Sequence, residues 1–337
     1  MIDFRYHLVS IIAVFLALAV GLLVGATYLS GPAETLLQKQ QKNATAENNA
    51  LRAKNAQLAG QIGADQAFAQ AGAARLLAGL LTSEKVAVVE APGVTSQMAA
   101  GVVTALQLAG ATVTEQVQLQ PGFVATTGAG ESSLSDLARQ LAGPAGVTLP
   151  ATPLYPGTAG QQDAAAVIAA SIVSRDGIGL PGSASTTILS GFAHSGFLQV
   201  KPGPTASSAT LAVLLTPAGA QPQLVSQGLT AFAAELKSAS LATVLAGGLS
   251  PVAATNAVTL AAGAGTVSTV DNADTESGEI VVAQVLRNLL SGRPVAAYGA
   301  GPGSAPSPAP TPSARTSTTS SHPSRSPSPG TSAGTSR

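Results

Sequence analysis

An uncharged stretch of 22 residues, 8–29, lies almost at the N-terminus and restricts the chain to few classes of protein. As a helix it would rise about 33 Å, enough to cross a hydrocarbon core of about 30 Å. The sequence therefore predicts one transmembrane helix that is retained as a signal anchor. Two alternatives stay open: a cleaved signal peptide, with Val24-Gly25-Ala26 as its cleavage site, and a buried helix of a soluble protein.

The charges on either side of this stretch do not decide which end of the chain is cytoplasmic. Arg5 precedes it, whereas Lys39 and Lys42 follow it, so the positive-inside count does not favour a translocated C-terminus. Long domains, however, cross membranes largely regardless of their charge. We therefore expect residues 1–7 to be cytoplasmic and the body of this single-pass cell-membrane protein to be extracytoplasmic.

Residues 34–81 are expected to form a helical stalk that pairs with a second copy. Leucine or alanine recurs every seven residues as d positions, and polar residues occupy three of the matching a positions, a pattern that favours a parallel coiled coil. Two glycines in the membrane stretch have the GxxxG spacing of closely packed helices, although glycine is common in such helices. A single solvated helix is the alternative to a homodimer. The predicted helix–dimer interface consists of Gly21, Gly25, Leu37, Ala44, Asn48, Leu51, Asn55 and Leu58.

Residues 82–299 are predicted to form a layered α/β domain with a mainly parallel sheet. A short apolar run at 86–89 predicts a buried strand, and a helical pattern follows at 96–109. Residues 111–119 are rich in β-branched side chains and alternate between apolar and polar, which predicts a second strand. Alternation of strands with helices indicates this class of fold. The later elements are expected as strands at 211–215, 242–245 and 266–270 and as helices at 132–142, 162–174, 221–239 and 276–291. The glycines at 247–248 and 263–265 are assigned to loops.

Composition excludes several kinds of chemistry. The chain has no cysteine, a net charge of zero and only 3% aromatic residues, which argues against disulfides, thiolate metal sites and nucleic-acid binding. The loop after residue 90 is neither GxGxxG nor a P-loop, and His194 has no GxSxG nucleophile motif beside it. We expect no enzyme activity and no cofactor, with His194 in a loop or in the core.

One acidic cluster follows the strand expected at 266–270. Asp271, Asn272 and Asp274 are candidate ligand residues in a loop, because carboxylates after a strand can bind a hard cation or a polar molecule. The alternative is that Asn272 or Asp274 caps the next helix, whose first turn favours acids.

The last 38 residues, 300–337, have a different composition from the rest. They consist almost entirely of Gly, Pro, Ser, Thr and Ala, with three arginines and no acid. Such a segment cannot bury a core, so the sequence predicts a disordered tail.

Several blocks resemble the actinobacterial family of MctB-like copper transporters. They are MIDFRYHLVSI at 1–11, the apolar stretch at 13–25, TVDNAD at 269–274, Gly278, Gly292-Arg293-Pro294 and Tyr298-Gly299. The resemblance covers residues 1–299 and implies an envelope protein of copper homeostasis, viewed in that family as an efflux or pore component.

The residues themselves show no copper pathway. Cu(I) prefers thiolate and thioether ligands, but Met98 is the only internal methionine and the three histidines are scattered. We therefore expect no copper site within one subunit, so that an oligomer or an envelope partner would supply any route for the ion. The alternative function is a dimeric, non-enzymatic scaffold or binding module in cell-envelope assembly or cell division.

Overall fold

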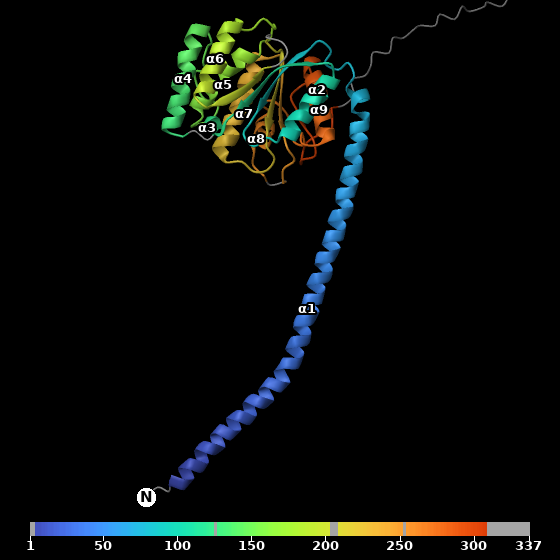
Figure 1. Ribbon diagram of the computed structural model, residues 1–337, viewed down its shortest axis with the longest axis vertical. Helices are drawn as coiled ribbons and strands as arrows, with labels where there is room; N and C mark the ends of the chain where they lie inside the picture. The colour runs from blue at the N-terminus through green and yellow to red at the C-terminus, as the bar shows by residue number, and fades with distance from the viewer. Residues whose placement is uncertain (1–3, 125–126, 203–207, 252–253, 309–337) are drawn as a thin grey trace, which may run out of the picture. The chain divides into compact units, whose positions relative to one another are not determined.

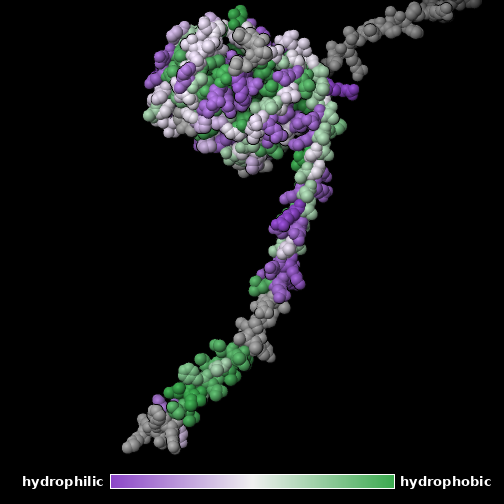
Figure 2. All heavy atoms as spheres, viewed as in Figure 1, coloured by the Kyte–Doolittle hydropathy of each residue, from purple (hydrophilic) through white to green (hydrophobic). Residues whose placement is uncertain are grey.

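The computed structural model describes residues 4–124, 127–202, 208–251 and 254–308, which divide into two units, 1–74 and 75–337. The first unit is helical and belongs to α1 (Phe4–Leu77). Within α1, residues Tyr6–Gly25 are the one candidate membrane span among the described residues, and Figure 2 shows them as a continuous apolar band. The predicted apolar N-terminal helix is thus confirmed.

Helix α1 continues without a break from the expected membrane span into the expected stalk. The helix runs through Gly31-Pro32 and ends at Leu77 rather than at residue 81. Gly79, with φ of +76°, follows that end, because a left-handed residue stops a helix. Leu77 and Leu81, near the start of the second unit, are both fully buried.

The second unit is built on a seven-stranded sheet in the order β3-β2-β1-β4-β5-β6-β7 (Figure 1). All neighbouring strands are parallel except β3, which runs antiparallel to β2 at the edge. The predicted class of fold, mixed α/β with a mainly parallel sheet, is confirmed. The strands are β1 (Lys85–Glu90), β2 (Thr112–Leu119), β3 (Leu198–Pro202), β4 (Leu211–Thr216), β5 (Ala242–Gly247), β6 (Ser268–Val270) and β7 (Ala297–Tyr298).

Helices cover both faces of this sheet (Figure 1). On one face α2 (Ser96–Leu108) packs against α9 (Glu276–Leu290). The other face carries α5, α7 and α8, with α4 and α6 packed on α5 and the short α3 against α7. Their bounds are α3 (Pro121–Val124), α4 (Ala129–Ala145), α5 (Ala159–Ile172), α6 (Gly182–His194), α7 (Gln223–Ala239) and α8 (Ala257–Ala264).

The largest core lies between the sheet and the α5–α7 side. Alternate residues of β1, such as Ala87 and Val89, point into it. The rings of Phe123 and Phe232 meet there edge to face, with their centroids 5.6 Å apart. Such aromatic pairs bury large apolar areas and fix the relative positions of the segments that carry them.

Four expectations from the sequence need correction. Gly247 is the last residue of β5. Gly263 lies inside α8, and Gly265, with φ of +61°, is the C-cap of that helix. His194 is the last residue of α6 and is exposed, so it lies neither in a loop nor in the core; its ring nitrogen contacts the carbonyl of Ser190 one turn earlier. The region 120–209 in addition contains α3, α6 and β3, none of which was expected from the sequence.

The fourth correction concerns the tail. Residues 300–308 are part of the body: the Gly299 N–H donates to the Ala305 carbonyl, and Ala305 forms a parallel bridge with Tyr298. These contacts give the segment order that its composition does not indicate. The rest of the predicted disordered tail, 309–337, lies outside the described residues.

Candidate functional site

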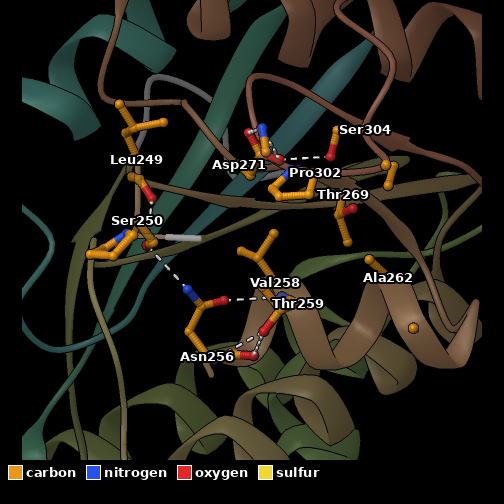
Figure 3. Close-up of a pocket in the computed structure, with 16 residues that line it drawn as sticks. Leu249, Ser250, Asn256, Val258, Thr259, Ala262, Thr269, Asp271, Pro302 and Ser304 are labelled. Atoms are coloured by element: carbon orange, nitrogen blue, oxygen red, sulfur yellow. Dashed lines mark hydrogen bonds between the residues drawn. The ribbon is translucent and has the colours of Figure 1, made fainter. Parts of the chain in front are cut away.

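A cavity of about 370 Å³ lies beyond the carboxyl ends of β5 and β6 (Figure 3). Ligands of open α/β sheets bind at this end of the strands. Three segments enclose it: the loop after β5 (248–251), the first two turns of α8, and a loop at 301–304. Its lining consists of Gly248, Leu249, Ser250, Pro251, Asn256, Val258, Thr259, Ala262, Gly263, Thr269, Asp271, Ala297, Gly301, Pro302, Gly303 and Ser304.

Asp271, predicted as a ligand residue, lies at one wall of this cavity and holds the 301–304 loop. Its Oδ1 accepts the N–H of Ala300 at 2.7 Å, and both carboxylate oxygens accept the N–H of Gly301. Its Oδ2 accepts the hydroxyl of Ser304 at 2.7 Å. A carboxylate with this many donors is fixed in place. Asp271 therefore builds the wall of the cavity.

Gly299 permits this arrangement. Its φ is +126°, and a Cβ at this position would overlap the Asp271 carboxylate. Only glycine combines such a backbone angle with so close an approach. The Tyr298-Gly299 pair noted in the sequence thus serves the turn that brings the 301–304 loop onto β6.

The other two predicted ligand residues also have structural roles. Asp274 Oδ1 accepts the N–H of Leu249 at 2.8 Å, which ties the loop after β5 to the start of α9. Asn272 is buried, and its Oδ1 has no hydrogen-bond partner. Neither residue caps α9, contrary to the alternative expectation. The N-cap is Thr275, whose hydroxyl accepts the N–H of Gly278, because Thr275 is the residue with extended backbone before the first turn.

The opposite wall depends on the capping of α8. Asn256 accepts the N–H of Thr259, and the Thr259 hydroxyl accepts the N–H of Asn256, which forms a capping box. Asn256 also donates to the Ser250 hydroxyl at 3.1 Å, and Ser250 accepts the N–H of Gly219. Figure 3 shows Ser250, Asn256 and Thr259 joined in this way. The sequence pattern Asn-x-x-Thr before an apolar run could have revealed this cap.

The lining of the cavity defines what it can bind. Its polar groups are hydroxyls, amides and a carboxylate that is already occupied by backbone donors, and leucine, valine and proline side chains form the rest. It contains no sulfur or imidazole ligand for Cu(I). Among the described residues, no group of three His, Asp or Glu could hold a metal ion. Met98 is buried in α2, and His194 lies on α6.

An acidic side chain with a perturbed pKa lies on α9, on the face of the sheet opposite to α8. Burial, together with the nearby carboxylates of Glu276 and Asp274, raises the pKa of Glu279 to about 7. The side chain extends over α2, where a Cβ at Gly101 would overlap its carboxylate. Glu279 therefore titrates near neutral pH at the contact between α2 and α9.

The residues predicted for a helix–dimer interface all lie on α1. Leu37, Leu51 and Leu58 are exposed in the single chain, and a Cβ at Gly21 or Gly25 would meet no atom within 4 Å. Ala44, Asn48 and Asn55 are also exposed. The single chain provides no partner for this row of residues, so the dimer stays a prediction.

Comparison with known proteins gives one consistent family. The model of a family described as "Copper transport outer membrane protein, MctB" matches residues 1–309. Proteins named "Copper transporter MctB" from Mycobacterium bovis and Mycobacterium tuberculosis are 28% identical to the chain over 310 residues, which cover 89% of this chain and 97% of each relative. The match includes residues 300–308, which the structure assigns to the body.

Proposed function

Because the chain belongs to the MctB family of copper transport outer membrane proteins, we propose that it takes part in copper transport or copper homeostasis at the cell envelope. One observation carries this proposal: the family match covers the apolar helix, the polar part of α1 and the whole α/β body together. The chain is a membrane protein anchored by the apolar segment of α1.

The chemistry of the residues limits the part that one subunit plays in this transport. Copper is the cargo, and the chain has no cysteine and a single internal methionine, which is buried. We infer that the body works as a non-enzymatic scaffold or binding module, and that copper passes through an oligomer or a partner protein. The engaged carboxylate of Asp271 supports this inference, since a ligand that already accepts four hydrogen bonds is a poor site for a cation.

For the arrangement in the envelope, we propose an uncleaved signal anchor with the body outside the membrane. A reporter fused after Pro308 tests this topology, because the body extends to that residue. Alkaline phosphatase is active only outside the cytoplasm. Green fluorescent protein fluoresces only inside the cytoplasm, because it does not fluoresce after export by the standard route. We expect active phosphatase and no fluorescence; the reverse result would place the body in the cytoplasm.

A deletion strain tests the function itself. We expect growth of the deletion strain to be inhibited at copper concentrations that the parent tolerates, and the full chain to restore growth. Normal copper tolerance together with defective septation would reject transport in favour of a scaffold in cell division. Zinc tolerance is the matched control, since a general weakness of the envelope would lower tolerance to both metals.

A further inference from the structure

A second cavity, of about 420 Å³, lies on the α2 face of the sheet, at the carboxyl ends of β1 and β2. It is separate from the cavity beside Asp271, which is enclosed by the loop after β5, by α8 and by the 301–304 loop. The chain leaves β1 toward β2 on one side and later adds β4, β5 and β6 on the other, so β1 lies where the strand order reverses. The crevice of this reversal lies between β1 and β4, whereas residues of β1, β2, β3 and α2 line the present cavity; it shares with such ligand sites its place at the carboxyl end of β1.

Glu90, the last residue of β1, is the most unusual side chain in this cavity. It is only 4% exposed, and its Oε1 is buried without a hydrogen-bond partner. A carboxylate oxygen that is buried without a partner lowers stability, because it has lost its hydration and gained no hydrogen bond in return. The arrangement is favourable when a cation or a strong donor enters the cavity and binds this carboxylate.

The polar groups beside Glu90 lie in a row across the strands. Gln118 of β2 is in register with Glu90, and Gln116 lies two residues earlier, on the same face of the sheet. Lys201 of the edge strand β3 pairs with Gln116. All four side chains line the cavity. From the spacing of strands and residues, the Cα atoms of Glu90 and Lys201 are about 12 Å apart.

The charges at the two ends of this row are opposite. Within the described residues, neither Glu90 nor Lys201 forms an ion pair with another side chain. The carboxamides of Gln116 and Gln118 lie between them and can each donate and accept hydrogen bonds. A ligand that fits this order has an ammonium group, at least one amide and a carboxylate.

We propose that the cavity binds a short peptide-like zwitterion, with its ammonium group at Glu90, its amide at Gln116 and Gln118, and its carboxylate at Lys201. The volume is that of a small-molecule site, and a dipeptide spans the distance once the lysine side chain turns inward. The cavity has this role whether or not the protein moves copper.

Calorimetric titration of the full chain in detergent, without copper, tests the proposal. The probes are L-alanyl-L-alanine, its N-acetyl form and its C-terminal amide. We expect saturable binding of the free dipeptide and binding weaker by about tenfold for each blocked form, as for the loss of one ion pair of about 1.4 kcal/mol. No saturable binding of the free dipeptide, or equal binding of all three probes, would overturn the proposal.

Two variants assign the ends of the ligand. Glu90→Gln should weaken binding of the free dipeptide about tenfold and raise the melting temperature, since it removes the unpartnered charge. Lys201→Gln should bind the free dipeptide and its amide equally. Asp136→Asn is the control, because this acid is 74% exposed on α4, far along the chain from the cavity. Unchanged binding by Glu90→Gln would contradict the assignment, and so would equal weakening in Asp136→Asn.

Discussion

The carboxylate of Asp271 and the hydroxyl of Ser304 are joined by a hydrogen bond of 2.7 Å across 33 residues of sequence. This bond, together with those from Ala300 and Gly301, attaches the last described loop to the end of β6. The wall of the cavity therefore comes from a segment whose composition resembles that of the tail. The family match, which extends to residue 309, includes this loop.

Asp271→Ala should detach this loop. The substitution removes four hydrogen bonds to a carboxylate, so we expect a loss of about 2–4 kcal/mol of stability and new cleavage by protease near residue 301. Thermal denaturation and limited proteolysis measure both effects. Ser304→Ala is the matched control, with an expected loss of about 1 kcal/mol; equal losses in the two variants would contradict the role given to the carboxylate.

Gly278→Ala should be among the more damaging single substitutions in the body. A Cβ at Gly278 would overlap the backbone carbonyl of Asn272, and backbone cannot move aside as a side chain can. We expect a loss of about 2–4 kcal/mol of stability, measured by thermal denaturation. Gly263→Ala provides the comparison: it lies in α8 with open space around it, so alanine should be neutral or stabilising there. A neutral Gly278→Ala would show that the turn into α9 tolerates a side chain.

The stability of the body should depend on the ionisation of Glu279. Its pKa is about 7 in the folded protein against an ordinary value of 4.5, so the folded state holds this proton more tightly than the unfolded state. Its contribution is fully present below about pH 4.5 and is lost as the pH rises through about 7. We expect the melting temperature to fall by a few degrees more between about pH 5 and pH 8 in the parent than in Glu279→Gln.

Gly101→Ala offers a second approach to the same group. The added methyl group would displace the Glu279 carboxylate from α2 toward solvent. Its pKa should then return toward the ordinary value, and the pH dependence of the melting temperature should become as shallow as in Glu279→Gln. Identical slopes in the parent and both variants would exclude Glu279 as the titrating group.

The proposed dimer can be tested with single cysteines, because the chain contains none. Leu51→Cys lies at a d position of the heptads, and Ala53→Cys lies two residues later, away from the expected seam. Oxidation of native membranes should crosslink Leu51→Cys well above Ala53→Cys. Equal or absent crosslinking would leave α1 as a single solvated helix.

Much of the fold could be predicted from the sequence because its central elements have strong local signals. β1, β4 and β5 are apolar runs, and α2 and α9 have apolar residues at helical spacing. By contrast, α6 consists largely of small and hydroxyl residues, a composition typical of loops. β3 is held by its pairing with β2, which no local sequence pattern predicts.

The sequence predicted where the candidate site lies better than it predicted what its residues do. Asp271 stands out because it follows a strand, and it does line the cavity. Its partners could not be found, since Ala300, Gly301 and Ser304 have the composition of the tail and gain order only through a contact 29 to 33 residues away. Glu90 was not predicted as a site residue, because a single acid at the end of an apolar run is typical of the start of a loop.

Copper content of cells tests the proposed function most directly. Cells that lack the gene, cells with the full chain restored and parent cells are grown in the same copper-containing medium, and their copper is measured by mass spectrometry. A protein that works in copper efflux predicts more copper in the deletion strain and the parental amount after restoration. Equal copper in all three strains would contradict a role in copper efflux.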